Sequence, residues 1–298
     1  ELVKMANLII LISKAVACMK RVDGVFELES SLRDGSGLNP AGAEKQSGPM
    51  VEFKRVSFSY GETQSEVLTD LSFCAMKGQT VGVIGGTGSG KSTLVNLIPR
   101  FYGVGKGMIL VDGRDVKDYS MKELRSIIGV VPQKAVLFKG SLKDNMRWGK
   151  ADASDEEIWE ALEIAQAKEV AEKKGQGLAF MIDQGGRNLS GGQKQRLCIA
   201  RALIGKAKIL IFDDSTSAVD TATEKKIREA LAARKNGTKI IIAQRVTSVM
   251  NTDQIIILDD GKVHRIGTHA ELLADDPIYQ EIYASQMKGG DENGSESL

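Results

Sequence analysis

The sequence predicts an α/β fold built around a parallel sheet. Three strongly apolar stretches, "KILIFDD", "KIIIAQ" and "QIIILDD", occur in the second half of the chain, and segments with helical patterns precede and separate the first two. Alternating strands and helices are typical of parallel sheets, whose strands are buried on both faces. A glycine-rich segment, "GGTGSGKST", follows another apolar strand, "TVGVI", and precedes a further helical pattern.

Composition limits the classes of protein that this chain can belong to. Its 298 residues, 42% of them hydrophobic, are enough for one large globular domain or two smaller ones. The formal charge of +1 provides no broad attraction to polyanions, so we expect no nucleic-acid partner. The three cysteines, Cys18, Cys74 and Cys198, are far apart and fit neither a disulfide framework nor a zinc site, which indicates a reducing compartment such as the cytosol.

Residues 1–30 have apolar residues at helical spacing. No uninterrupted apolar run reaches the roughly 18 to 20 residues that a membrane-spanning helix needs, and no signal-peptide pattern is present. The chain opens on Glu1 rather than Met, so we expect a piece of a longer protein, with residues 1–30 forming the cytosolic end of a preceding helical domain. The alternative is an amphipathic helix that packs on its own domain.

The middle and the end of the chain predict a linker, a domain and a tail. Residues 31–49 are rich in Gly, Ser and Pro, which is typical of a linker. A domain is predicted from residue 50 to residue 286, beginning with the strand pattern "VEFKRVSFSY" and further short strands. Residues 287–298 are polar and Gly-rich, so we expect a disordered tail.

Residues 141–188 predict a helical insertion between two parts of the sheet. They lack the apolar strand patterns found on either side and carry helical patterns instead. Ser154 followed three residues later by Glu157 has the form of a capping box, which marks the start of a helix.

The segment "GGTGSGKST", residues 85–93, matches the phosphate-binding pattern G-x-x-x-x-G-K-[ST] between a strand and a helix. Its glycines let backbone N–H groups turn toward phosphate oxygens, Lys91 can reach the β- and γ-phosphates, and the Ser92 hydroxyl can bind Mg²⁺. The alternative is a glycine-rich turn that binds nothing. The predicted nucleotide-contacting residues here are Gly85, Gly86, Thr87, Gly88, Ser89, Gly90, Lys91, Ser92 and Thr93.

A second motif predicts the rest of the metal site. "ILIFD" is a buried apolar strand that ends in Asp213, and it resembles the second motif of P-loop NTPases. Asp213 would then hold Mg²⁺ directly or through water. The alternative is a solvated turn after a core strand.

The segment "LSGGQ", residues 189–193, opens the helical pattern "QKQRLCIARALI". A helix N-terminus with exposed N–H groups and a hydroxyl is suited to an anion. Because the helical insertion separates this segment from the phosphate-binding loop, one monomer is not expected to close both on one nucleotide, whereas two copies facing head to tail would. The predicted contacts to that nucleotide are Ser190, Gly191, Gly192 and Gln193.

These motifs, in this order over residues 50–285, resemble the nucleotide-binding domain of ABC transporters, specifically the exporter type with a membrane domain earlier in the same chain. The resemblance implies a P-loop NTPase core, an N-terminal antiparallel β-subdomain and an inserted α-helical subdomain. It also implies ATP and Mg²⁺ as cofactors, ATP hydrolysis coupled to export, and a position at the cytoplasmic face of a bacterial inner or plasma membrane. The implied partners are a second nucleotide-binding domain and the transmembrane domain of the full-length chain.

The resemblance also gives roles to single residues. Tyr60 matches the aromatic residue that stacks on adenine, and Gln133 matches the glutamine that reaches Mg²⁺ and the attacking water, in a loop that senses the membrane domain. Gln184 stands where exporters usually have Glu, in a segment that touches the membrane domain. "SAVD", residues 217–220, matches the loop that senses the other domain's site. Residues 1–30 match the end of the last transmembrane helix and its cytosolic extension.

Two positions depart from the family pattern. Asp214 stands where active members have the Glu that activates water, and Gln244 stands where they have a His that contacts the γ-phosphate. Asp is shorter than Glu by about 1.5 Å, and a displacement of about 1 Å can cost on the order of a hundredfold in rate. Gln cannot become cationic or titrate near neutral pH. By sequence position His264 and His269 cannot replace the missing imidazole.

We therefore predict that this chain's own site, with Asp214, Gln244, Gln133 and Lys91 in the catalytic positions, retains ATP and hydrolyses it poorly. Its intact "LSGGQ" would complete a competent site on a different partner chain that carries the Glu and the His. The alternatives are a homodimer that hydrolyses slowly at both sites, an importer subunit, a soluble ABC ATPase of DNA repair or translation, and a regulatory nucleotide-binding module. Drug, lipid and peptide all stay open as the transported substrate.

Overall fold

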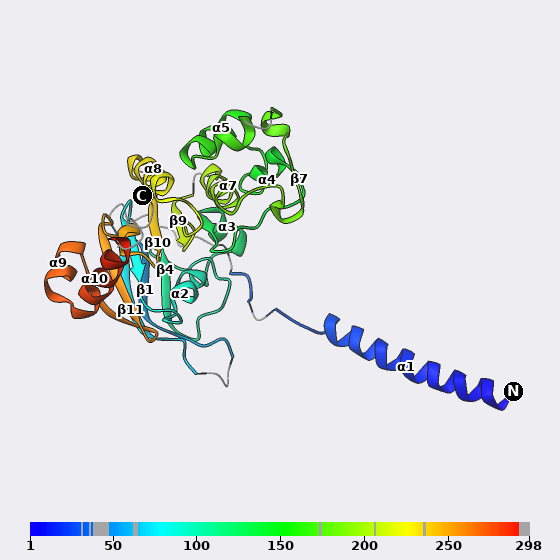
Figure 1. The fold of residues 1–298 in the computed structure, drawn as a ribbon. Coiled ribbons are helices and arrows are strands. Elements are labelled where there is room, and N and C mark those ends of the chain that lie inside the picture. The colour runs from blue at the N-terminus through cyan, green and yellow to red at the C-terminus, as the bar shows by residue number, and fades with distance from the viewer. Residues whose placement is uncertain are drawn as a thin grey trace. The chain divides into compact units, whose positions relative to one another are not determined.

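The computed structural model describes residues 1–30, 32–35, 37, 48–61, 65–172, 175–205, 207–234 and 237–291. The chain divides into two compact units, residues 1–33 and residues 34–298. Figure 1 shows their elements along the chain. Much of the predicted linker lies outside the described residues, and the domain boundaries stay predictions.

The first unit is the helix α1 (Leu2–Phe26), which has no buried residue. By length and composition it could cross a membrane, with a mean hydropathy of 1.8 in its most apolar window. The expectation that no segment reaches membrane-spanning length is therefore wrong for α1. That expectation required an uninterrupted apolar run, which Ser13 and Lys14 break, whereas a helix of this length tolerates single polar residues.

The second unit contains a six-stranded sheet in the order β12-β11-β3-β10-β9-β6. All neighbouring pairs are parallel except β11 and β12. The predicted α/β fold with a parallel sheet is confirmed, and all five residues of β9 are buried, as its apolar sequence requires. The strands are β3 (Thr80–Ile84), β6 (Ile128–Val131), β9 (Ile209–Asp213), β10 (Thr238–Ile242), β11 (Gln254–Asp259) and β12 (Lys262–Gly267).

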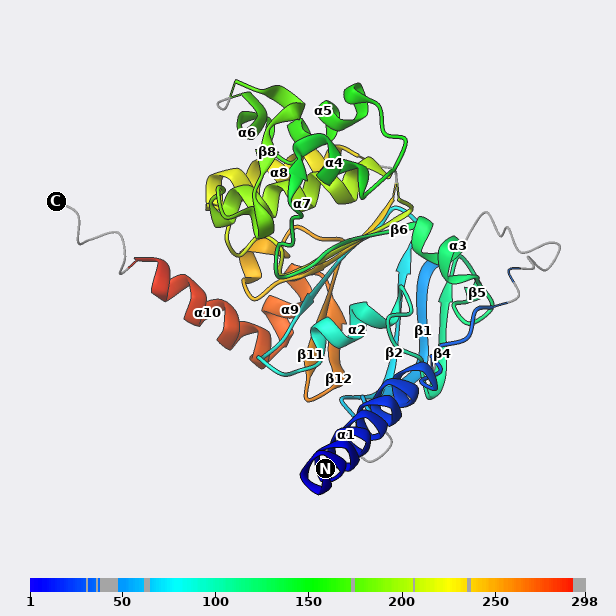
Figure 2. The same cartoon turned by 90° about the vertical axis from the view of Figure 1, so that its right-hand side faces the viewer.

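A second sheet, in the order β2-β1-β4-β5, is antiparallel throughout. It confirms the antiparallel β-subdomain that the family resemblance implies. Its inner face joins the main core, where Phe53 and Phe73 stack with ring centroids 4.5 Å apart. The strands are β1 (Pro49–Phe58), β2 (Leu68–Met76), β4 (Lys106–Val111) and β5 (Arg114–Asp115). Figure 2 shows this sheet beside α2 (Lys91–Leu97) and α3 (Met121–Ser126).

The predicted insertion is mainly helical, and its buried residues belong to a second cluster that also includes residues of β6 and β9. In Figure 2 its elements gather above the parallel sheet. Ser154 and Glu157 form the predicted capping box at the start of α5. Its elements are the short strands β7 (Gly140–Ser141) and β8 (Met181–Ile182), the helices α4 (Leu142–Arg147), α5 (Asp155–Ile164) and α6 (Lys168–Glu172), and the 3₁₀ turns η1 (Gly177–Ala179) and η2 (Gln184–Gly186). Helix α7 (Gly191–Ile204) follows the insertion.

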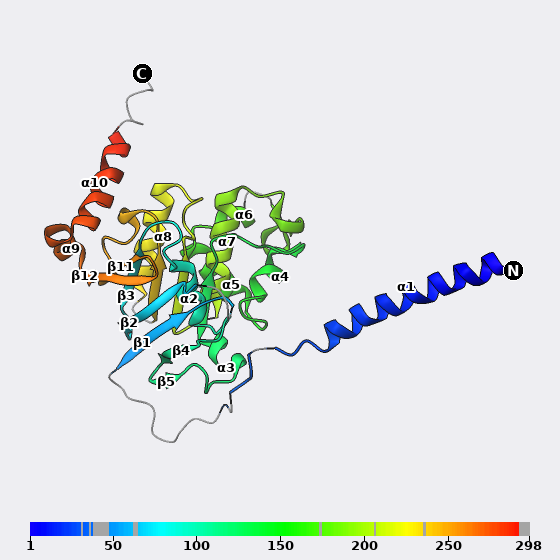
Figure 3. The same cartoon turned by 90° about the horizontal axis from the view of Figure 1, so that it is seen from below.

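The C-terminal part packs against the sheet through a third cluster, which includes the fully buried Tyr279. Its elements are η3 (Val246–Ser248), α9 (His269–Asp275) and α10 (Pro277–Asp291). Helix α8 (Thr221–Ala233) packs into the second cluster through Ile227 and Leu231. Figure 3 shows α9 and α10 together at one end of this unit. Helix α10 extends to Asp291, within the range of the predicted tail, and residues 292–298 lie outside the described residues, so the bounds of the tail stay a prediction.

Candidate functional site

A cavity of about 460 Å³ lies where β3, β9 and β10 end. The carboxyl edge of a parallel sheet is the usual place for a ligand in α/β proteins. The lining residues are Ile84, Gly85, Gly86, Thr87, Gly88, Lys91, Ser92, Gln133, Asp213, Asp214, Ile242, Gln244, Ile282 and Gln286. The phosphate-binding loop, the two strand-end carboxylates and the two glutamines therefore meet in one place.

Two glycines of the phosphate-binding loop, Gly85 and Gly90, stand where a side chain would clash with neighbouring atoms. Gly90 has a φ of 94°, and a Cβ there would lie 2.5 Å from Cδ2 of Leu68. A Cβ on Gly85 would lie 2.0 Å from the carbonyl oxygen of Leu258. Gly86 and Gly88 would meet no atom within 4 Å, so the loop is open on the side of the cavity that they line. A loop with this geometry fits a phosphate chain.

Lys91 lies across the mouth of the loop. Its Nζ donates to the carbonyl oxygens of Gly85 (2.9 Å) and Gly86 (2.6 Å) and to Oγ of Ser89 (3.3 Å). Burial lowers the pKa of Lys91, while the charges of Asp214 and Asp213 raise it. The ammonium is thus held between its own loop and the two carboxylates, within the same cavity.

Ser92 and Asp213 bring two oxygen ligands together. The Ser92 hydroxyl donates to Oδ1 of Asp213 at 2.9 Å. Burial raises the pKa of Asp213, the hydrogen bond from Ser92 lowers it, and the charge of Asp214 raises it. Oxygen ligands of this kind suit Mg²⁺, which commonly keeps several waters and binds substrate phosphates as well. Among the described residues no cluster of three His, Cys, Asp or Glu side chains could hold a metal.

Asp214 is held by two amide side chains. Its Oδ2 accepts from Nε2 of Gln244 at 2.8 Å and, in a longer contact, from Nε2 of Gln133 at 3.4 Å. Its backbone is left-handed, with a φ of 44°, and its N–H donates to the carbonyl oxygen of Ile242 at 3.0 Å. Burial raises the pKa of Asp214, while Gln133, Lys91 and Gln244 lower it. All four predicted catalytic residues therefore line one cavity.

Tyr60 does not line this cavity, but it is hydrogen-bonded to α2, the helix that follows the phosphate-binding loop. Its hydroxyl is hydrogen-bonded to Oγ1 of Thr93 at 2.8 Å. Its ring packs edge-on against Phe58 and Tyr102, and 47% of the residue is exposed. An exposed ring that is fixed from two sides offers a face on which a flat base can stack.

The "LSGGQ" segment forms the start of α7 and does not line the cavity. Oγ of Ser190 accepts from the N–H of Gln193 at 3.3 Å, and Oε1 of Gln193 accepts from the N–H of Ser190 at 3.0 Å. A Cβ on Gly192 would lie 3.0 Å from the carbonyl oxygen of Ala218, so the segment lies beside the "SAVD" loop.

Two residues of the cavity, Ile282 and Gln286, come from α10 and have no motif that could have identified them. Nε2 of Gln286 donates to the carbonyl oxygen of Gln244, and Oε1 of Gln286 accepts from the N–H of Val246, both at 2.8 Å. A polar residue on a helix has many possible partners, so only the fold shows this contact.

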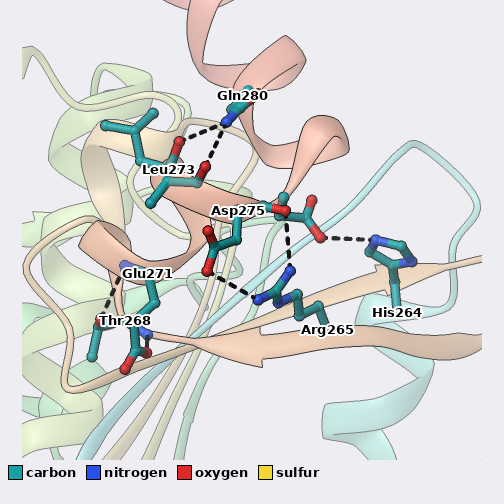
Figure 4. A network of polar contacts seen from close by, with 9 residues as sticks. His264, Arg265, Thr268, Glu271, Leu273, Asp275 and Gln280 are labelled. Atoms are coloured by element: carbon teal, nitrogen blue, oxygen red, sulfur yellow. Dashed lines mark hydrogen bonds and ion pairs between the residues drawn. The ribbon is translucent and has the colours of Figure 1, made fainter.

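The two histidines make contacts elsewhere. Nε2 of His264 is hydrogen-bonded to Oδ2 of Asp276 at 2.9 Å, in the network of Figure 4. Nδ1 of His269 is hydrogen-bonded to the hydroxyl of Tyr279 at 2.7 Å. Neither lines the cavity, in agreement with the expectation from sequence position.

Comparison with known proteins gives a consistent result. The family model described as "ABC transporter" matches residues 68–217. The uncharacterized ABC transporter ATP-binding protein YfiB of Bacillus subtilis is 44% identical over 290 residues, 97% of this chain and 49% of that protein. A Staphylococcus aureus protein named "Putative multidrug export ATP-binding/permease protein" is 39% identical over 266 residues, 88% of this chain and 46% of that protein.

A solved structure, a bacterial Atm1-family ABC exporter with ATP bound, matches with a TM-score of 0.84 and 34% identity, over 92% of this chain and 48% of that one. This chain spans about half the length of the curated relatives it matches. The match to the family model, the identity to these relatives and the fold agree with one another. The chain belongs to the ABC transporter family and carries its ATP-binding ATPase domain.

Proposed function

We propose that this chain is the ATP-binding domain of an ABC exporter whose own nucleotide site is impaired in hydrolysis. The exporter assignment is supported by two similar proteins: the S. aureus relative named for multidrug export and the Atm1-family exporter. Helix α1, apolar and without a buried residue, is consistent with the end of a membrane domain. The domain would then lie at the cytoplasmic face of a bacterial inner or plasma membrane.

In this proposal the phosphate-binding loop and Lys91 hold the phosphates of ATP, and Tyr60 stacks on its adenine. Ser92, Asp213 and Gln133 would hold Mg²⁺, which when bound would neutralise charge on the phosphates. Lys91 must exchange its contacts to Gly85 and Gly86 for phosphate oxygens, which an ammonium with three donors can do.

The observation that carries the impaired-site proposal is the pair of contacts on Asp214. A general base must present a carboxylate oxygen to the attacking water and accept its proton. Oδ2 of Asp214 accepts from Gln244 and Gln133. Although burial raises the pKa of this carboxylate, these two hydrogen bonds fix it and lower its pKa, which makes it a weaker base than it would be without them. The short side chain is thus held back by the residues that surround the site of reaction.

The position of Ser190 supports a head-to-tail partner. Ser190 and the glycines after it are well ordered by their capping contacts, yet they do not line this chain's own cavity. They would therefore face the nucleotide of a second nucleotide-binding domain. A partner that carries Glu and His at the catalytic positions would form one competent site, whereas a homodimer would be slow at both.

Exposed apolar side chains near the Gln133 loop support contact with a transmembrane domain. Val136, Phe138 and Trp148 are 46%, 45% and 69% exposed, and the rings of the last two lie 4.9 Å apart. With Arg125 and Arg201 they line a hollow of about 360 Å³. A hydrophobic patch of this kind is typical of a protein interface.

The test is single-turnover hydrolysis by the full-length protein that contains this chain, with and without a partner carrying Glu and His. We expect this chain to bind ATP and keep it unhydrolysed, and hydrolysis to appear with the partner and to depend on Ser190. Rapid hydrolysis by the chain alone that Asp214→Asn abolishes would contradict the impaired-site proposal. Slow hydrolysis at both sites of a homodimer, with no increase when the partner is added, would favour the alternative.

A further inference from the structure

We propose that Gln286 of α10 is a positioning residue for the reaction at the nucleotide site. This inference rests on the proposed function, since it concerns the same cavity. It starts from the two hydrogen bonds of the Gln286 side chain, which donates to the carbonyl oxygen of Gln244 and accepts from the N–H of Val246. One amide thus fixes the main chain on both sides of Arg245.

The contact matters because Gln244 lies between two regular elements. The strand β10 ends at Ile242, and regular structure resumes only with the 3₁₀ turn η3 at Val246. Gln286 bridges this irregular stretch. Since Nε2 of Gln244 donates to Asp214, the position of the Gln244 main chain determines where that carboxylate is held.

Helix α10 is firmly placed at this point of its length. Tyr279 is fully buried, and Ile282 and Tyr283 pack against the cluster that contains Val246. Ile282 and Gln286 are one helical turn apart and both line the nucleotide cavity. The core therefore holds α10, and α10 in turn holds the Gln244 segment through Gln286.

Two substitutions separate the two bonds. Gln286→Met keeps the length of the side chain and removes both bonds. Gln286→Glu keeps the acceptor for the Val246 N–H and removes the donor to the Gln244 carbonyl. The matched control is Gln280→Met on the same helix, because Nε2 of Gln280 donates to the carbonyl oxygens of Leu273 and Ala274, away from the cavity (Figure 4).

The first measurement is hydrogen exchange of the Val246 amide in the full-length protein, which reports the contact whether or not ATP is hydrolysed. We expect exchange to accelerate in Gln286→Met and to stay slow in Gln286→Glu and Gln280→Met. Unchanged exchange in Gln286→Met would show that the contact does not hold the segment, and would overturn the inference.

The second measurement is single-turnover hydrolysis of 8-azido-ATP crosslinked to this chain, together with its Kd. We expect both Gln286 variants to raise the slow rate about tenfold with little change in Kd, because the loosened Gln244 segment holds Asp214 less tightly while the phosphate contacts stay. An equal rise in Gln280→Met would show a merely structural role for α10. Failure of the unaltered protein to bind ATP would refute the proposed function, and the Val246 exchange would still decide the contact.

Discussion

At the scale of single residues, the reach of Asp214 can be tested by adding one methylene. Asp214→Glu moves the carboxylate forward by about 1.5 Å, past its contacts with Gln244 and Gln133, so we expect single-turnover hydrolysis in this chain's site to rise roughly ten- to a hundredfold. The hydrolysis rate of the double variant, Asp214→Glu with Gln244→His, should be higher still. Asp214→Asn is the matched control. No increase in either Glu variant would show that side-chain length does not limit the rate.

The charge of Asp213 should cost stability when neither nucleotide nor Mg²⁺ is bound. Burial raises the pKa of Asp213, so between its ordinary and its raised pKa the folded state binds more protons than the unfolded state, and stability falls as pH rises through this window. We expect Asp213→Asn to raise the free energy of unfolding at pH 7 by about 1 kcal/mol, an ordinary size for one substitution.

This difference should shrink toward pH 4, where the carboxylate of the unaltered protein is increasingly protonated. Urea denaturation at both pH values measures it, with Asp115→Asn, another carboxylate of the same unit, as the control. If Asp213→Asn raised the free energy of unfolding more at pH 4 than at pH 7, the charge of Asp213 would not be the cause of the lower stability.

At the scale of elements, Ser190 has two separable roles at the start of α7. Ser190→Ala removes the hydroxyl that caps the N–H of Gln193, so we expect a loss of about 1 kcal/mol in stability. Ser190→Asp keeps a capping oxygen and should keep stability, but its negative charge would repel the phosphates of a partner-bound nucleotide.

Thermal unfolding and hydrolysis by the assembled transporter distinguish these roles. Both variants should lose most of the hydrolysis, and only Ser190→Ala should lose stability. Full hydrolysis in Ser190→Asp would show that this segment does not face a phosphate.

At the scale of the whole molecule, we expect the exposed pair Phe138 and Trp148 to contact the membrane domain and so couple ATP hydrolysis to transport. Trp148→Glu places a charge on a 69% exposed aromatic surface and should leave ATP binding intact, while transport and substrate-stimulated hydrolysis fall by at least about tenfold. Met108→Glu, at an exposed apolar position of β4 in the antiparallel sheet, is the control and should leave transport unchanged. Unchanged transport in Trp148→Glu would place the membrane-domain contact elsewhere.

Local patterns in the sequence were sufficient to predict the fold class and most of the cavity lining. Runs of buried apolar residues predict β9, β10 and β11, because strands of a parallel sheet are covered on both faces. The glycine and lysine pattern predicts the phosphate-binding loop, since its backbone geometry depends on those residue types at that spacing. These signals lie within short windows, which is why a single sequence reveals them.

Only the tertiary structure decided which distant side chains share the site. It brings Gln133, Asp214 and Gln244 within hydrogen-bonding reach, and it adds Gln286 from a helix whose sequence carries no sign of the contact. The membrane-spanning length of α1 was missed for a related reason, because it depends on the whole helix and not on an uninterrupted run. Contacts between residues far apart in the chain depend on how complete elements pack, and this information is not contained in any short window.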